Sequence, residues 1–287
     1  MKLLRHGTKG HWKPGVVDTQ GQVRDLSSVM PDITPQVLSP AGLAKLRSLD
    51  LSELPVVQPA DLGVPWSGMG KFVCIGLNYA DHAEESNLPI PKEPIIFMKP
   101  LSAAVGPNHP VVLPQGSVKS DWEVELGVVI GSTARYVSED QALQHVAGYC
   151  VVNDVSEREY QMDRGGTWDK GKGCDTFGPV GPWLVTADEV AHPQNLSMWL
   201  EVNGHRYQKG STRTMIFGVA QLVSYVSRFM TLYPGDLIST GTPPGVGMGV
   251  KPSAVYLKPG DVMRLGIEGL GEQHQKVHAW DPALIDG

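Results

Sequence analysis

The stretch that decides the fold of this chain is Lys119-Ser-Asp-Trp-Glu-Val-Glu-Leu-Gly-Val-Val-Ile-Gly131. Apolar residues alternate with acidic or small ones, which predicts a β-strand with Glu123 and Glu125 on the same side. Residues two apart on a strand are separated by roughly 6.5 to 7 Å, so both carboxylates could converge on one cation. A solvent-facing acidic stripe explains the same pattern and is favoured by this segment alone. However, Gly127, Val129 and Gly131 continue the acidic face, which is typical of a crowded surface or one that a ligand approaches.

The composition predicts many short strands. The chain has 287 residues, of which 41% are hydrophobic and 19% are charged, as expected for a soluble protein with a sizeable core. Its 33 glycines and 23 prolines recur between short apolar runs, which favours strands and turns over a helical bundle. We therefore expect a mainly β fold with some helices, of the α+β class.

Charge and hydropathy exclude several classes of partner. The net charge is −6 and there is no basic run, so neither nucleic acid nor an anionic membrane is expected as a partner. No apolar run approaches transmembrane length, and the first residues lack the apolar segment of a signal peptide. Cys74 and Cys150 lie inside apolar runs, which predicts buried thiols and a cytoplasmic location.

Two domains are expected: a small N-terminal α+β domain at 1–68 and a larger domain at 69–287, which contains the candidate residues for chemistry described below. In the first, short strands are followed by a helix with Ser39 as its N-cap and Pro40 at its first position. A segment rich in proline and glycine, 54–70, is the predicted linker. The first domain carries no recognisable chemistry, so we expect it to pack or to make oligomer contacts.

In the larger domain, strands and helices alternate. Asn78 is the expected N-cap of a short helix, and Ser138 with Gln141 has the pattern of a capping box. An apolar stripe that includes Phe229 predicts a core-facing helix over 214–230. Other expected elements are strands at 71–76, 95–98 and 149–153, a helix at 155–161, and a hairpin at 196–208 with an Asn203-Gly204 turn.

Several polar residues are candidates for chemistry. On the short helix, His82 and Glu85 are three residues apart and face the same way, although a surface pair is the ordinary explanation. Asp154 follows the apolar strand at 149–153, a place where an aspartate is often only a turn or cap residue. Lys172 lies between two glycines in a long connection that could fold over a site.

The glycine-rich segment 241–249 suggests a loop that presents backbone N–H groups to a small anion. It lacks the Gly-Lys-Ser/Thr of a phosphate-binding loop and does not open a helix after a first strand, so it matches no nucleotide-binding motif.

A metal site is the simplest use of the acidic residues. Glu123, Glu125 and Asp154 supply oxygen ligands from two strands, with no histidine or cysteine cluster to favour a softer metal. Such a set suits Mg²⁺ or Mn²⁺ with open positions for water. Three carboxylates and a divalent ion leave a negative charge, so an anionic substrate would need Lys172 or Arg158 nearby.

Five motifs occur in order and together span roughly residues 70 to 280. They are Gly76-Leu-Asn-Tyr-Ala-Asp-His82, Glu123-Val-Glu-Leu-Gly-Val-Val129, Asn153-Asp-Val-Ser-Glu-Arg-Glu-Tyr-Gln161, Lys172 and Thr240-Gly-Thr-Pro-Pro-Gly-Val-Gly247. In this order they resemble the fumarylacetoacetate hydrolase family. The resemblance implies a mixed β-sandwich roll, a homodimer and a small oxo-acid substrate.

The resemblance also implies roles for particular residues. The first domain resembles the N-terminal extension of bacterial members that act on 2,4-diketo-3-deoxy sugar acids. Glu123, Glu125 and Asp154 would bind Mg²⁺, with Mn²⁺ as an alternative. His82 with Glu85 would activate water, and Lys172 would serve the leaving carbanion. Arg158, Gln161 and Thr242 would hold the oxo-acid.

The expected reaction is hydrolysis of a C–C bond in a 2,4-diketo acid, either an acylpyruvate or a diketo sugar acid, to pyruvate and a second carboxylic acid. The same metal site could instead serve an oxo-acid decarboxylase, a tautomerase or isomerase, or a ureidoglycolate-type lyase. A non-catalytic module that binds oxo-acids is the alternative from another class.

Overall fold

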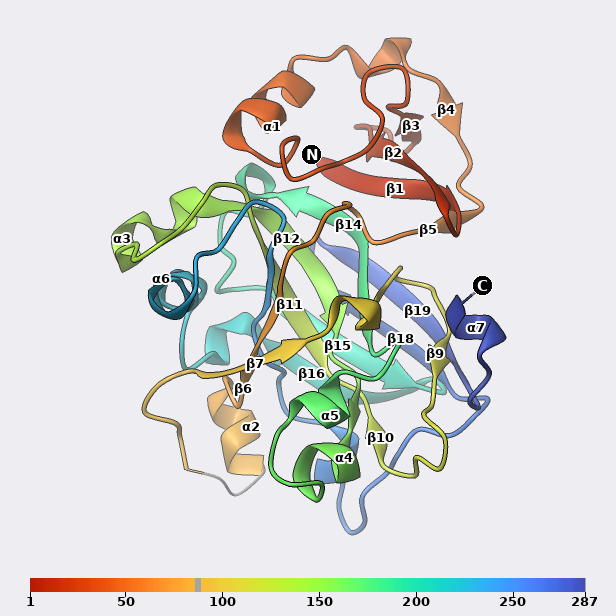
Figure 1. The fold of residues 1–287 in the computed structure, drawn as a ribbon, viewed down its shortest axis with the longest axis vertical. Coiled ribbons are helices and arrows are strands. Elements are labelled where there is room, and N and C mark those ends of the chain that lie inside the picture. Colours follow the sequence, from red (N-terminus) through yellow and green to blue (C-terminus); the bar gives the residue numbers. More distant parts are fainter. Residues whose placement is uncertain (86–88, 287) are drawn as a thin grey trace.

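A computed structural model describes residues 1–85 and 89–286 of the chain (Figure 1). Within these residues the largest sheet has twelve strands, in the order β4-β3-β2-β1-β14-β12-β11-β17-β6-β7, with β5 beside β1 and β8 beside β14. Most neighbours are antiparallel, whereas β17 with β6 and β14 with β8 are parallel. The strands are β1 (Lys2–Thr8), β2 (His11–Val17), β3 (Val23–Asp25), β4 (Val56–Val57), β5 (Asp61–Leu62), β6 (Phe72–Gly76), β7 (Ile95–Lys99), β8 (Ala104–Val105), β11 (Val124–Ile130), β12 (Val146–Asn153), β14 (Gly178–Thr186) and β17 (Leu237–Ser239).

A second sheet packs against the first. Its five strands run in the order β16-β15-β18-β19-β9, and a separate pair joins β10 to β13. The main core contains Leu126 and Val128 of β11 together with Leu200 of β15 and Leu265 of β18. This two-sheet core confirms the predicted mainly β fold with helices. The strands are β9 (Val111–Val112), β10 (Ser120–Asp121), β13 (Ser156–Glu157), β15 (Ser197–Val202), β16 (His205–Ser211), β18 (Val262–Ile267) and β19 (Gly271–His278).

The helices are short and lie around the sheets. In residues 1–85 and 89–286, no helix is both long and apolar enough to cross a membrane. The α-helices are α1 (Pro40–Arg47), α2 (Ala80–Glu85), α3 (Glu139–Ala142), α4 (Arg158–Met162), α5 (Asp169–Lys172), α6 (Val219–Phe229) and α7 (Ala283–Asp286). Single 3₁₀ turns are η1 (Leu51–Glu53), η2 (Leu101–Ala103), η3 (Leu143–His145), η4 (Ala187–Glu189), η5 (Thr212–Thr214) and η6 (Gly247–Gly249).

The central acidic stretch is buried on both faces, so the solvent-facing explanation is wrong. The stretch forms β10 and then β11, with Trp122 and Glu123 between the two strands. Glu123 is only 5% exposed and Glu125 only 1%. A Cβ atom at Gly127 would lie 2.7 Å from the sulfur of Cys150, so this face is crowded as its glycines indicated.

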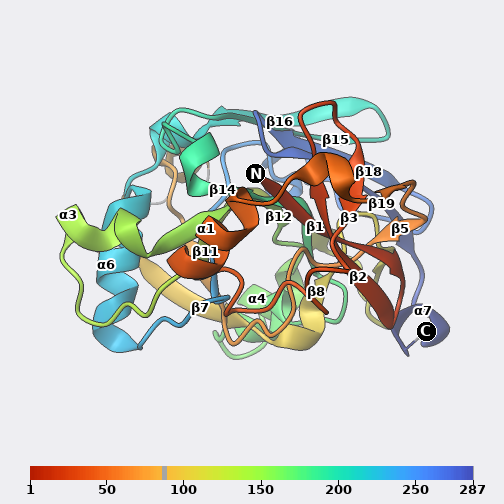
Figure 2. The ribbon, with the colours of Figure 1, turned by 90° about the horizontal axis from the view of Figure 1, so that it is seen from above.

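The N-terminal unit extends the main sheet. Figures 1 and 2 show it at one end of that sheet, where β1 pairs with both β2 and β14. The pairs Lys2↔Val185 and Leu3↔Leu184 join the two parts, and Leu3 shares a core with Val129 of β11. Because backbone hydrogen bonds and apolar contacts cross the expected boundary, this unit and the larger part share one sheet. The division between 1–68 and 69–287 stays a prediction.

Only some of the helix starts and lengths predicted from the sequence are confirmed. The side chain of Ser39 accepts a hydrogen bond from the amide of Gly42, as its N-cap pattern predicts. Ser138 makes no such bond, and its short helix gives way to β12 at Val146, so the capping box is wrong. The predicted long helix begins at Val219 and leaves Phe229 62% exposed.

Asn78 does not cap α2. Its amide nitrogen donates to the carbonyls of Phe217 and Thr240 at 3.0 and 2.8 Å, and its oxygen accepts from the amide of Phe217. These hydrogen bonds connect the residues before α2 to two segments that are distant in sequence. They therefore help to hold α2, the helix that carries His82, in place.

Candidate active site

Three acidic side chains converge where two neighbouring strands end. In the antiparallel pair of β11 and β12, Val124 lies opposite Asn153, so the start of β11 meets the end of β12. Glu123 precedes β11, Glu125 lies within it, and Asp154 follows β12. One carboxylate oxygen from each lies within 4.8 Å of the others, and all three residues are buried. Strand pairing therefore gathers the three predicted metal ligands.

The burial of these carboxylates makes their charges interact strongly. Burial, followed by repulsion from Asp154 and Glu123, raises the pKa of Glu125 well above its ordinary value. One oxygen of Glu125 accepts hydrogen bonds from the hydroxyl of Ser239 and the amide of Gly241, at 2.6 and 2.9 Å. A positive charge beside Glu125 would relieve the repulsion, so the donor set and its electrostatics both fit a divalent cation.

Glu123 differs from Glu125 because cations face it. Burial alone would raise the pKa of Glu123, but Lys172 and Arg158 outweigh that effect and hold its pKa at about 2. The ammonium of Lys172 donates to Glu123 at 2.7 Å and to Asp154 at 2.8 Å. Lys172 ends α5 and is 2% exposed, so it belongs to a buried network and not to the flexible loop that its glycines suggested.

The glycine before Lys172 permits this placement. A Cβ atom at Gly171 would lie 2.3 Å from the backbone oxygen of Glu157, so α5 can approach α4 only without a side chain there.

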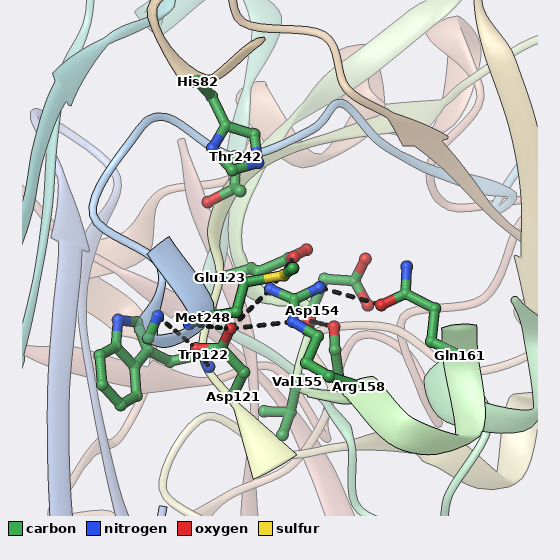
Figure 3. Close-up of polar contacts among 12 residues, drawn as sticks. His82, Asp121, Trp122, Glu123, Asp154, Val155, Arg158, Gln161, Thr242 and Met248 are labelled. Carbon is green, nitrogen blue, oxygen red and sulfur yellow. Dashed lines mark hydrogen bonds and ion pairs between the residues drawn. The ribbon is translucent and has the colours of Figure 1, made fainter. Parts of the chain in front are cut away.

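Arg158 occupies the centre of a second set of contacts (Figure 3). Its guanidinium lies 2.8 Å from Asp121 and 2.7 Å from Glu123. It also donates to the side-chain oxygen of Gln161 at 3.0 Å. Arg158 and Gln161, two of the three predicted substrate-binding residues, therefore contact other side chains of the protein. Most donors of Arg158 serve to hold carboxylates in place.

Sequence reasoning missed Lys99. This lysine ends β7 and is fully buried, with its ammonium 2.7 Å from the second oxygen of Asp154. It also donates to the carbonyls of Val155 and Lys172. The sequence feature that could have identified Lys99 is its position directly after the apolar residues of a predicted strand.

Asp121 was also missed, although it lies on the acidic face of the opening stretch. One of its oxygens accepts from the amides of Trp122 and Gly247, at 2.8 and 2.6 Å. The other accepts from the amide of Met248 at 3.1 Å and from Arg158 at 2.9 Å. Asp121 thus links the turn η6 to Arg158.

The glycine-rich segment 241–249 binds carboxylates of the protein. The amide of Gly241 donates to Glu125, and the amide of Gly245 donates to both oxygens of Glu85, at 3.0 and 3.1 Å. The expectation that this loop receives an external anion is therefore wrong for these amides. Gly245 has φ of +101°, and a Cβ there would lie 2.0 Å from a backbone oxygen, so only glycine fits.

His82 and Glu85 form a pair on α2. The Nδ1 atom of His82 lies 3.1 Å from a Glu85 oxygen, and the amide of Gly245 fixes that carboxylate from the other side. Thr242 lines the same cavity as His82. The Thr242 hydroxyl donates to the carbonyl of Val124 and accepts from Gln208, at 2.9 and 2.8 Å, so its proton already serves the protein.

One cavity of about 780 Å³ brings these groups together. Its volume lies within the range of about 300 to 1,000 Å³ typical of ligand sites. Asp154 does not line it but contacts Lys172, which does. The other predicted site residues all line it: His82, Glu85, Glu123, Glu125, Arg158, Gln161, Lys172 and Thr242.

Comparison with known proteins agrees with this arrangement. Residues 71–278 match the model of the fumarylacetoacetate (FAA) hydrolase C-terminal family. The chain belongs to this family. A putative hydrolase from Burkholderia multivorans is 62% identical over 280 residues, which are 97% of this chain and 99% of that protein.

Solved structures of similar proteins include an isomerase and a hydrolase. The 2-hydroxyhepta-2,4-diene-1,7-dioate isomerase of Mycobacterium marinum is 34% identical, with a TM-score of 0.74 over 97% of this chain and 98% of that one. The maleylpyruvate hydrolase of Sphingobium sp. SYK-6, in complex with manganese(II) and pyruvate, is 30% identical, with a TM-score of 0.81 over 98% of this chain and 100% of that one. Proteins similar to this chain thus include both hydrolases and isomerases.

Proposed function

We propose that this protein is a metal-dependent hydrolase that cleaves a C–C bond in a 2,4-diketo acid and releases pyruvate. The substrate would be an acylpyruvate or a 2,4-diketo-3-deoxy sugar acid. The observation that carries the proposal is that two carboxylates of a buried acidic trio, a buried lysine and a His–Glu pair line one cavity, with the third carboxylate, Asp154, in contact with that lysine.

Glu123, Glu125 and Asp154 are the proposed ligands of one divalent cation. Carboxylate oxygens suit Mg²⁺ or Mn²⁺. A cation would also relieve the repulsion from Asp154 and Glu123 that, together with burial, raises the pKa of Glu125. The similar maleylpyruvate hydrolase that contains manganese(II) and pyruvate supports this assignment. When bound, such a cation supplies Lewis-acid stabilisation of the negative charge that develops on the oxo-acid.

The formal charges of the inner network suit an anionic substrate. Four carboxylates and three cationic side chains leave one negative charge, which a divalent ion would change to one positive charge. A single substrate carboxylate would then make the site neutral. The network consists of Asp121, Glu123, Glu125, Asp154, Lys99, Arg158 and Lys172.

His82 is the proposed general base. Its Nδ1 faces Glu85, so we assign Nε2 as the atom that takes a proton from water. Glu85, held by the amide of Gly245, keeps the ring in place. A positioned base of this kind accelerates a reaction by roughly 10²- to 10⁴-fold.

The bond changes balance with one water molecule. Its oxygen forms a bond to the distal carbonyl carbon, and the bond from that carbon to the methylene group breaks. The electron pair leaves as the enolate of pyruvate, which takes up a proton at the methylene carbon. Two of the three N–H donors of Lys172 face Glu123 and Asp154, so the third remains to stabilise the enolate oxygen.

Isomerisation is the nearest alternative, because a similar solved structure is an isomerase. A decarboxylase, a tautomerase or a lyase would also use the metal site without adding water to a carbonyl carbon. These reactions differ from hydrolysis in their products, and a non-catalytic oxo-acid-binding module would give no product at all.

A product assay tests the proposal. A panel of 2,4-diketo acids is incubated with chelator-treated protein, with and without Mg²⁺ or Mn²⁺, and pyruvate and the second acid are quantified. We expect equimolar products only with metal, and a loss of roughly 10²- to 10⁴-fold in the His82→Ala variant. Glu85→Gln removes the charge that keeps the His82 ring in place and should also lower product formation. Glu84→Gln is its control, because Glu84 is an exposed neighbour on α2 that does not line the cavity. An isomer, carbon dioxide or no product from every substrate would overturn the proposal.

A further inference from the structure

The backbone between two of the proposed metal ligands is held by side chains from distant segments. Glu123 and Glu125 lie at the inner end of the cavity, and Val124 separates them. The N–H of Val124 donates to the side-chain oxygen of Gln208 at 2.9 Å. Its carbonyl accepts from the hydroxyl of Thr242, also at 2.9 Å. Both backbone groups of the intervening residue are therefore bonded to side chains.

Val124, Gln208 and Thr242 form a closed ring of hydrogen bonds. The amide nitrogen of Gln208 donates to the Thr242 hydroxyl at 2.8 Å, and this hydroxyl donates in turn to Val124. The same nitrogen donates to the carbonyl of Pro243 at 2.8 Å, so both of its N–H groups are used. The reverse orientation of the amide would place its nitrogen against the N–H of Val124. The ring thus needs one side chain that both accepts and donates, which an amide supplies.

An irregularity in β16 accompanies this placement of Gln208. The register between β15 and β16 shifts between Leu200, which pairs with Gln208, and Glu201, which pairs with Arg206. Strand β16 therefore contains one extra residue at this point. Such bulges re-aim side chains and are frequent beside active sites. Gln208 is fully buried, although it follows the exposed start of the strand.

Two glycines let β16 approach the glycine-rich loop. A Cβ atom at Gly210 would collide with the ring of Pro243. A Cβ atom at Gly245 would collide with the backbone of Tyr207. Because neither glycine carries a side chain, the loop comes close enough for Gln208 to bond to its residues.

The spacing of the two carboxylates depends on the backbone that joins them. Residues two apart on a strand are separated by roughly 6.5 to 7 Å at Cα. One oxygen each of Glu123, Glu125 and Asp154 nevertheless lies within 4.8 Å of the others. A rotation of the peptide groups on either side of Val124 would change the directions of both glutamate side chains. Gln208 does not line the cavity, so it acts on the site through Val124.

We propose that Gln208 is a positioning residue for the metal site: through the ring with Thr242 it fixes Val124 and thereby the spacing of the flanking glutamates. Gln208 lies outside the five motifs of the sequence. The inference rests on the metal binding of the proposed function, but it does not depend on which reaction follows.

Gln208→Met tests the inference, because methionine has a similar size but lacks the amide. Mn²⁺ is titrated calorimetrically into chelator-treated protein without substrate, well below the unfolding temperature of each variant. We expect affinity for Mn²⁺ to fall about 10- to 100-fold. The electron paramagnetic resonance spectrum of Mn²⁺ bound at saturation should also change, because its ligands are displaced. A loss of stability alone would not alter that spectrum.

Gln194→Met is the matched control. The side-chain oxygen of Gln194 accepts from the amide of Val219 at 2.6 Å, and its nitrogen donates to the carbonyl of Thr212 at 3.2 Å. Gln194 thus joins two segments as Gln208 does, but it does not line the cavity or contact the acidic segment. Its replacement should lower the unfolding temperature and keep Mn²⁺ affinity within about twofold of the wild-type value.

Thr242→Val opens the ring from the other side and leaves the amide of Val124 paired with Gln208. It therefore decides the question if Gln208→Met does not fold. We expect weaker Mn²⁺ binding in this variant too. The double variant should bind Mn²⁺ about as weakly as the weaker single variant, because a ring that is already open has no further effect to lose.

The outcomes separate this inference from the proposed function. Wild-type Mn²⁺ affinity in folded Gln208→Met or in Thr242→Val would overturn the inference, and so would an equal loss in Gln194→Met or independent losses that multiply in the double variant. If the wild-type protein binds Mn²⁺ and Gln208→Met binds it weakly, but no 2,4-diketo acid yields pyruvate, the positioning role stands and the hydrolase proposal falls. A wild-type protein that binds no Mn²⁺ would overturn both.

Discussion

The inner and outer ends of the cavity differ in how firmly their charged groups are held. At the inner end, Asp154 contacts two lysines, and Arg158 contacts two carboxylates. At the outer end, His82 has a single side-chain partner, Glu85. Removing one member of a buried pair costs about 3 to 5 kcal/mol, whereas an exposed pair contributes about 0 to 1 kcal/mol. Metal binding is thus expected to depend on the inner end, and proton transfer on the His82–Glu85 pair at the outer end.

The largest effect on activity is expected from Glu125→Gln. Lewis-acid stabilisation is worth several kcal/mol, and each 1.36 kcal/mol is tenfold, so pyruvate release should fall at least about 10³-fold. A carboxyl group whose pKa is raised by folding opposes folding once pH exceeds its unfolded value. At pH 7 the metal-free variant should therefore melt at a higher temperature than the metal-free wild type.

Thermal unfolding in chelator and the pyruvate assay check both effects, with Glu268→Gln as a surface control. A variant that keeps a tenth of the wild-type activity, or that melts lower without metal, would show that Glu125 does not have the role assigned here.

The next prediction concerns the outer end, where His82→Gln removes the proposed base and leaves the metal ligands in place. Without its base, the enzyme should lose roughly 10²- to 10⁴-fold in kcat, while its affinity for Mn²⁺ stays unchanged because no inner carboxylate is disturbed. Steady-state kinetics and Mn²⁺ calorimetry provide the two readouts, and the exposed His192→Gln is the control. Equal loss of metal affinity would mean that the two ends are not independent.

Asp121→Asn tests whether the contact between Asp121 and Arg158 helps to position the metal ligands at the inner end. Asp121 holds Arg158, which in turn faces Glu123, so the substitution should weaken Mn²⁺ affinity or activity by about 10- to 100-fold. Calorimetry and kinetics measure the change, with Asp188→Asn, a surface ion-pair residue, as the control. Wild-type behaviour in both assays would remove Asp121 from the account.

The smallest expected effect is on stability, and it compares two serines that precede helices away from the cavity. Ser39 caps its helix with a side-chain hydrogen bond, whereas Ser138 does not. Ser39→Ala removes the N-cap bond of α1 and should cost about 1 kcal/mol of unfolding free energy. Ser138→Ala removes no such bond and should change stability by less than about 0.5 kcal/mol. Urea unfolding of both variants measures the difference, and equal costs would contradict it.

The three acidic residues could be predicted from the sequence because each of the two strands that carry them is recognisable from neighbouring residues alone. Alternation places Glu123 and Glu125 together, and the apolar run before Asp154 predicts the neighbouring strand. The burial of the trio could not be read from that pattern, because it depends on the second sheet and on Lys99, a distant residue. Motifs common to the family supplied the roles proposed for His82 and its partners.

Other expectations failed where distant segments decided the structure. The amides of the glycine-rich loop bind Glu85 and Glu125, which lie more than 100 residues earlier in the chain. The side chain of Asn78 donates hydrogen bonds to the carbonyls of Phe217 and Thr240, so it does not cap α2. Such contacts follow from tertiary packing, and no local pattern contains them.

The most direct test of the account is the anomalous difference map of a crystal soaked in Mn²⁺. We expect one strong peak per chain, at about 2.0 to 2.3 Å from carboxylate oxygens of Glu123, Glu125 and Asp154. The same soak of Asp154→Asn crystals should give a weak peak or none. A wild-type map without a peak among these three residues, or with its strongest peak elsewhere, would contradict the central claim.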